Sequence, residues 1–156
     1  TAEQADAMEL GKLYAIQTTA STTEGAQYVY CKKLVKNETG ERPLYTGYHS
    51  TVSAFYYGTL IVGDQFDGNF DGYSALDTNI PLSSLKEPTA FDSPTTFAVA
   101  SVIPGWTAAL QLMRAGERWM LYIPWQSAYG SSGNNDGTIP GYTALTFDLL
   151  LERIVE

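Results

Sequence analysis

The chain has 156 residues and a mass of 17.1 kDa, a length that suits one domain and excludes a second catalytic domain. Of its residues, 44% are hydrophobic, 17% charged and 13% aromatic, a composition that can fill a core and excludes disorder of the whole chain. Nine basic against seventeen acidic residues give a net charge of −8, which argues against nucleic acid as a partner because phosphates would be repelled. One cysteine, Cys31, and one histidine, His49, exclude an internal disulfide and a Cys/His zinc cage, so we expect no metal and no cofactor.

The first 26 residues are predicted to stand apart from the rest of the chain. Residues 2–18 contain few helix breakers and place Ala7, Leu10 and Tyr14 on one helical face, which predicts a helix. The small polar residues that follow, up to Gly25, are typical of a linker. We therefore expect a helix and linker over residues 1–26, packed on a domain that spans residues 27–156. A dimerisation role for this helix is the alternative, and we expect a monomer.

The remaining patterns alternate strands with one helix. Gly58 inside a strand pattern predicts a bulge or a close backbone approach, and residues 68–96 have no sustained period, which predicts a long inserted surface loop. Pro104 and Gly116 bracket a helix over residues 103–115. Strand patterns cover residues 27–35, 51–60, 97–99, 118–124 and 142–154, and a turn over 61–66 leads into a further strand. The order predicts an α+β fold, with an antiparallel sheet of about five to six strands wrapped around one short helix.

Few residues suggest conventional catalysis. A Ser-His-Asp or Cys-His arrangement would have to use His49, which is better explained as a solvated loop histidine. The acids Asp64, Asp67 and Asp71 could form acid/base pairs, although solvated loop positions explain them better. No apolar run approaches the ~20 residues that a membrane-spanning helix needs.

A series of short motifs follows one order along residues 43–156. They are Tyr56-Tyr57-Gly58-Thr59-Leu60, Gly63-Asp64-Gln65-Phe66-Asp67, Val102-Ile103-Pro104-Gly105-Trp106, Ala128-Tyr129-Gly130, Ile139-Pro140 and Leu145-Thr146-Phe147-Asp148. In this order they resemble the FKBP-type peptidyl-prolyl cis-trans isomerases, nearest the bacterial macrophage-infectivity-potentiator branch. The resemblance implies an FKBP-like fold and a non-covalent isomerase.

The resemblance also implies a pocket, position by position. Asp67, Tyr129 and Phe66 fall on the catalytic positions, with Asp67 as the pocket carboxylate and the Tyr129 hydroxyl as a hydrogen-bond donor. The substrate-binding positions fall on Tyr56, Phe97, Val102, Ile103, Trp106, Ile139 and Phe147, with Trp106 as the floor and the Ile103 N–H as a second donor. Plain core packing is the alternative for each aromatic residue.

The function implied is rotation of X–Pro bonds in folding polypeptides, which needs no nucleophile, cofactor or metal. The expected partners are proline-containing polypeptides and macrolide inhibitors. A non-catalytic chaperone or peptide-binding module on the same fold is the main alternative, and a cell-surface protein that binds a sugar or partner through its eleven tyrosines is a third. By resemblance the expected location is the periplasm or cell envelope of a bacterium, and the start at Thr1 predicts a mature or trimmed chain.

Overall fold

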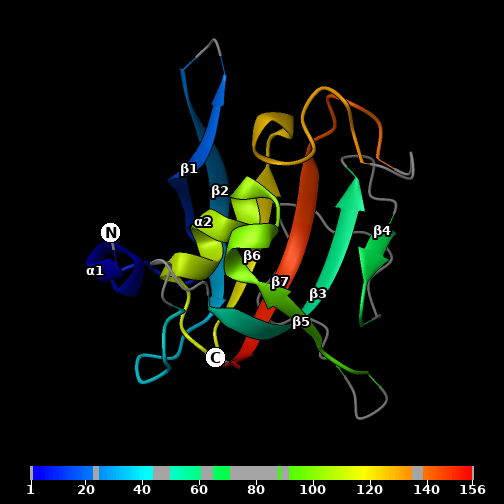
Figure 1. The fold of residues 1–156 in the computed structure, drawn as a ribbon. Coiled ribbons are helices and arrows are strands. Elements are labelled where there is room, and N and C mark those ends of the chain that lie inside the picture. Colours follow the sequence, from blue (N-terminus) through cyan, green and yellow to red (C-terminus); the bar gives the residue numbers. More distant parts are fainter. Residues whose placement is uncertain are drawn as a thin grey trace.

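The structure is a computed structural model, and it describes residues 2–22, 25–43, 50–60, 65–70, 88, 92–134 and 139–155. The strands of the described residues form one antiparallel sheet with a helix against one face (Figure 1). The elements in chain order are α1 (Ala2–Asp6), β1 (Leu13–Thr22), β2 (Gly25–Val35), β3 (Thr51–Leu60), β4 (Gln65–Gly68), β5 (Thr95–Ala98), the 3-10 turn η2 (Val99–Ser101), α2 (Pro104–Leu112), β6 (Arg118–Ile123), the 3-10 turn η3 (Trp125–Ser127) and β7 (Leu145–Ile154).

The sheet has seven strands in the described residues, in the order β1-β2-β6-β7-β3-β4, and β5 pairs with β3. Every pairing is antiparallel. The α+β class and the antiparallel sheet against the short helix α2 are therefore confirmed, with seven strands in the described residues instead of the expected five to six. Helix α2 ends at Leu112, before the predicted residue 115, because Met113 takes an extended conformation and is buried in the core.

The predicted helix over residues 2–18 is wrong beyond its first turns. Only α1 is helical, and residues 13–22 form β1, in register with β2 from Leu13 opposite Lys32 to Thr22 opposite Gly25. Gly11, with φ 76°, turns the chain between the two elements. The predicted linker over 18–25 is also wrong, since it contains the end of β1 and the start of β2. This hairpin crosses the boundary expected after residue 26.

The main core lies between α2 and the inner face of the sheet. Trp106, Ala109 and Leu110 of α2 are buried against Val29 of β2 and Leu121 of β6, among other apolar side chains. Gly105 lets the helix approach closely, because a Cβ there would lie 2.7 Å from Ile123 Cγ2. The strand alternation therefore positions α2, and α2 in turn positions Trp106.

The outer face of the sheet is also buried over its centre. Leu34, Tyr57, Phe70 and Met120 form a second apolar cluster there. Beside it lies a buried ion pair, in which Arg118 of β6 donates to both carboxylate oxygens of Asp148 on β7, at 2.8 and 2.5 Å. The first residues of the predicted loop insertion over 68–96 are therefore ordered parts of the domain: Gly68 ends β4 and Phe70 packs in this cluster. Residues 71–87 and 89–91, the body of that insertion, lie outside the described residues.

The N-terminal segment is held on the domain by charges. The carboxylate of Asp6 bonds to the guanidinium groups of Arg42 and Arg114. Two arginines beside one carboxylate hold the pKa of Asp6 well below its usual range.

Among the described residues no helix is long and apolar enough to span a membrane.

Candidate functional site

A cavity of about 300 Å³ opens beside the N-terminal end of α2. Strands β3, β4, β5 and β7 and helix α2 supply most of its aromatic side chains, and the chain before α2 and the loop after η3 complete it. Its lining residues are Tyr56, Phe66, Asp67, Phe97, Ser101, Val102, Ile103, Trp106, Tyr129 and Phe147. This cavity, which we call the aromatic pocket, is lined mainly by apolar and aromatic side chains with a few polar groups, as ligand pockets usually are.

Trp106 lies at the centre of the aromatic contacts. Its ring is 5.2 Å from Tyr56, 5.0 Å from Phe97 and 5.2 Å from Phe147, measured between ring centroids, and all three contacts are edge-to-face. Phe66 packs edge-to-face on Phe147 at 5.4 Å. Such pairs contribute about 0.5–1.5 kcal/mol each beyond the burial of their area. The rings therefore brace one another and hold the pocket in a fixed shape.

A glycine in β3 makes room for two of these rings. A Cβ on Gly58 would lie 2.6 Å from Phe147 Cε1 and 2.9 Å from Phe66 Cζ, closer than real Cβ contacts come. The β3–β4 register also shifts between Gly58 and Thr59. The predicted bulge or close backbone approach at Gly58 corresponds to a shift of register and to the close approach of two side-chain rings. Phe66 and Phe147 can meet over β3 only because this position has no side chain.

The polar side of the pocket pairs a tyrosine with a carboxylate. Burial, and then the hydrogen bond that its hydroxyl donates to Asp67, raise the pKa of Tyr56 above its ordinary value. Asp67 Oδ1 also accepts a hydrogen bond from the Gly68 N–H at 2.8 Å. Tyr129 lines the same pocket with 38% of its surface exposed. Asp67 and Tyr56 thus form a positioned polar pair at the edge of an apolar cavity.

The start of α2 contributes backbone groups. Ile103 is the N-cap residue and has no side-chain cap, and Pro104 occupies the first turn, where its missing N–H is tolerated. A helix N-terminus carries partial positive charge and exposes N–H groups that no helical carbonyl satisfies. In the part of the chain that the structure describes, the buried Nε1 of Trp106 has no hydrogen-bond partner. The start of α2 therefore lies at the aromatic pocket, and Ile103 and Trp106 both line it.

The structure brings together nine of the ten residues predicted for the site. The exception is Ile139, which is 2% exposed and packs in the main core instead of lining the cavity. Sequence reasoning left two contributors out of the site: Ser101, which lines the rim, and Gly58, whose signal was a glycine within a strand pattern. The competing candidates His49, Asp64 and Asp71 lie outside the described residues.

The profile described as FKBP-type peptidyl-prolyl cis-trans isomerase matches residues 46–152, more than two thirds of the chain. The chain belongs to this family. The match contains strands β3 to β6, α2, all but the last two residues of β7 and all residues of the aromatic pocket.

Individual relatives agree with this assignment. The macrophage infectivity potentiator of Trypanosoma cruzi is 52% identical over 76 residues, which are 45% of this chain and 38% of that protein. The outer membrane protein MIP of Legionella longbeachae is 40% identical over 106 residues, 68% of this chain and 34% of that protein. The chain thus spans little more than a third of the length of these relatives.

A solved structure shows the same fold over the whole chain. The crystal structure of a peptidyl-prolyl cis-trans isomerase from Pseudomonas syringae pv. tomato has a TM-score of 0.61 and 25% sequence identity, and the match covers 99% of this chain and 91% of that one. The likeness to the infectivity-potentiator branch that the motifs indicated is confirmed.

Proposed function

We propose that this chain accelerates cis–trans isomerisation of X–Pro bonds in polypeptides, and that the aromatic pocket is where the proline binds. The observation that carries this proposal is the coincidence of the pocket with the family match: every lining residue falls within residues 46–152. An X–Pro bond rotates over a barrier of about 18–20 kcal/mol, because planarity carries amide resonance. Lowering that barrier needs an environment that favours the twisted bond, and no covalent step.

The pocket can supply that environment in two ways. Its edge-to-face rings surround the proline and exclude water, which weakens the solvation of the planar, charge-separated amide. Donors at fixed positions bind the carbonyl of the twisted bond better than that of the planar one, so the stabilisation is realised in the transition state. In this proposal the donors are the Ile103 N–H and the Tyr129 hydroxyl. Asp67 orients Tyr56 and polarises the edge of the pocket.

Proline-limited refolding of a model substrate tests the proposal, with a short X–Pro peptide as a second substrate. Tyr129→Phe removes a hydroxyl donor, and Asp67→Asn removes the negative charge but keeps an acceptor oxygen. We expect each to lower kcat/KM about tenfold or more, since hydrogen bonds to charged or developing charges contribute about 1.5–3 kcal/mol. Tyr28→Phe is the matched control, because Tyr28 is 41% exposed on β2 and does not line the pocket. A folded wild-type chain without any acceleration refutes the proposal.

We also propose a bacterial envelope location for the protein. The support is that the relative from Legionella longbeachae is an outer membrane protein by name. Fractionation of cells that express the natural full-length gene product tests this, and recovery in the cytosolic fraction alone contradicts it.

A further inference from the structure

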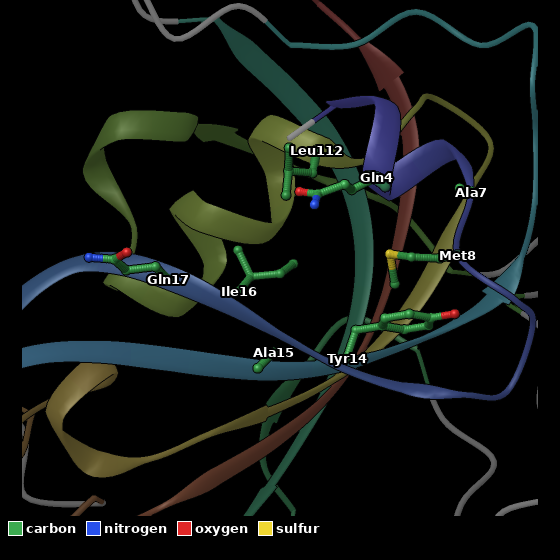
Figure 2. Close-up of a pocket in the computed structure, with 9 residues that line it drawn as sticks. Gln4, Ala7, Met8, Tyr14, Ala15, Ile16, Gln17 and Leu112 are labelled. Carbon is green, nitrogen blue, oxygen red and sulfur yellow. The ribbon is translucent and has the colours of Figure 1, made fainter.

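A second and larger cavity lies at the other end of α2. It measures about 470 Å³ and is lined by Gln4, Ala5, Ala7, Met8, Tyr14, Ala15, Ile16, Gln17 and Leu112. Figure 2 shows the side chains of Met8, Ile16 and Leu112 around the space between α1, β1 and α2. None of the lining residues is charged. None belongs to the aromatic pocket either.

The lining shows that this cavity runs along a strand edge. Tyr14, Ala15, Ile16 and Gln17 are consecutive residues of β1, and successive side chains of a strand point to opposite faces of the sheet. A cavity on one face would touch every second residue, so contact with all four places it beside the strand. β1 ends the strand order, and in the described residues it pairs only with β2.

The edge of such a strand offers its outward backbone N–H and C=O groups to another chain. We propose that this cavity, the β1 groove, binds an extended, uncharged apolar segment of the polypeptide substrate by adding it as a further strand beside residues 14–17. Strand addition supplies main-chain hydrogen bonds, and the apolar floor receives alternate side chains. The β1–β2 register is irregular between Gln17 and Ser21, which ends the regular edge there. The inference takes its occupant, the substrate chain, from the proposed function.

Two observations favour the substrate chain as the occupant. First, a second copy of this chain would bring a net charge of −8 toward an equal charge, which opposes self-association. Second, the groove leads toward the aromatic pocket: beyond it, Thr18 Oγ1 on β1 lies 3.1 Å from Ser127 Oγ of η3, two residues before Tyr129. The groove lies at Leu112, at the C-terminal end of α2, and the pocket lies at Ile103, just before its N-terminal end. The helix rise places these two residues about 13 Å apart. An extended chain covers that distance with about four residues.

The direct test is binding of a labelled seven-residue peptide of alternating valine and threonine, without proline and with capped, uncharged ends. Its fully N-methylated twin keeps the side chains but cannot donate main-chain hydrogen bonds. Ala15→Lys places a charge in the groove at an exposed position of β1, and Leu13→Lys places the same charge on an exposed residue of the same strand outside the groove. We expect N-methylation and Ala15→Lys each to weaken binding tenfold or more, and Leu13→Lys to change it less than twofold.

Three results would overturn the inference. They are equal binding of the two peptides, equal binding by wild type and Ala15→Lys, and no binding of the unmethylated peptide by wild type. A dimer in sedimentation that Ala15→Lys dissociates would overturn it too, because the groove would then belong to a second copy.

Isomerisation of a short X–Pro peptide keeps the two proposals separate. A tetrapeptide whose proline occupies the aromatic pocket has at most three further residues, fewer than the about four that the distance to the groove requires. We therefore expect Ala15→Lys to leave its turnover unchanged. Turnover of a refolding protein substrate should fall several-fold in the same variant. If wild type turns over neither substrate, the proposed function fails, whereas the peptide-binding result still decides for or against the groove.

Discussion

Replacing Gly58 by alanine tests how the aromatic pocket keeps its shape. The added Cβ would lie 2.6 Å from Phe147 Cε1, whereas ordinary contact begins at 3.4 Å, so the ring or the strand must move by about 0.8 Å. Phe66 Cζ at 2.9 Å blocks part of the space into which Phe147 could turn. The alanine therefore has to push apart two rings that now touch edge-to-face.

The expected cost follows from overpacking. Extra methyl groups in well-packed sites cost about 1–3 kcal/mol, and replacing glycine returns about 0.4–1 kcal/mol by restricting the unfolded chain. We expect a net loss of about 1–2 kcal/mol of unfolding free energy, at about 2–4 °C in Tm for each kcal/mol. A misplacement near 1 Å can lower catalysis about 100-fold, so kcat/KM for an X–Pro peptide should fall about 10–100-fold.

Thermal unfolding and peptide isomerisation measure the two effects. Phe147→Leu is the partner variant, because the shorter side chain frees the space that the Cβ needs. If the reasoning is right, the stability losses of Gly58→Ala and Phe147→Leu are less than additive, with a coupling of about 0.5–3 kcal/mol. An unchanged Tm together with an unchanged kcat/KM in Gly58→Ala would refute the argument that this glycine sets the pocket wall.

Three further variants test other parts of the fold. Burial raises the pKa of the Cys31 thiol to about 12, above its ordinary value of 9.0, so the folded state favours the protonated thiol. This contribution to stability is fully present below pH ~9 and is lost between that pH and the raised pKa. In urea titrations at paired pH values, Cys31→Ala should therefore lose less stability at alkaline pH than the wild type. Arg118→Met leaves Asp148 buried without its cation and should cost about 3–5 kcal/mol in denaturant unfolding, most of which a second substitution, Asp148→Leu, restores. Tyr142 has φ 61°, a left-handed conformation that strains a tyrosine by about 1–3 kcal/mol. Its ring contact with Trp125 returns about 0.5–1.5 kcal/mol, and a glycine there would add about 0.4–1 kcal/mol of unfolded-chain entropy. Tyr142→Gly should therefore raise Tm slightly, and a clear fall would show that the ring contact and the chain entropy outweigh the strain.

The central strands were predictable because their signals are local. Residues 51–60 and 118–123 are rich in β-branched, aromatic and other apolar side chains, and both form strands within one residue of the predicted bounds. Met120 lies in the outer cluster and Tyr122 packs against it, whereas Trp119 and Leu121 lie in the main core on the opposite face. Period and residue type suffice where both faces of a strand are well defined.

β1 was not predictable because its sequence satisfies two periods. Ala7, Leu10 and Tyr14 recur at helical spacing, yet Tyr14 and Ile16 also alternate with exposed residues as a strand requires. Pairing with β2, a tertiary interaction, decides between them. The β1 groove could not be predicted for the same reason, since it exists only where β1 is a strand and forms an edge.

The site was predictable from motif order, but its details depend on contacts between distant segments. Nine pocket residues follow from the family resemblance, whereas the position of Ile139 depends on packing: its N–H bonds to Asn134 Oδ1 at 2.9 Å and its side chain enters the core. Asn69 is a comparable case. Its side chain accepts a hydrogen bond from the Tyr56 N–H and donates one to Ala54 O. These bonds attach the start of the predicted insertion to β3. A contact of this kind leaves no periodic pattern in the sequence from which it could be predicted.

The way α1 is anchored explains why a groove remains beside β1. A helix of five residues is too short to be stable alone, so tertiary contacts must hold it. Lys33, buried on β2 and paired with Glu117, donates to Ala5 O at 2.6 Å, and the two arginines hold Asp6. These bonds fix α1 through its backbone and its charged side. Ala5 of α1 and Ile16 of β1 therefore line the same cavity, the β1 groove, from opposite sides. The bonds that anchor α1 set the width of this groove.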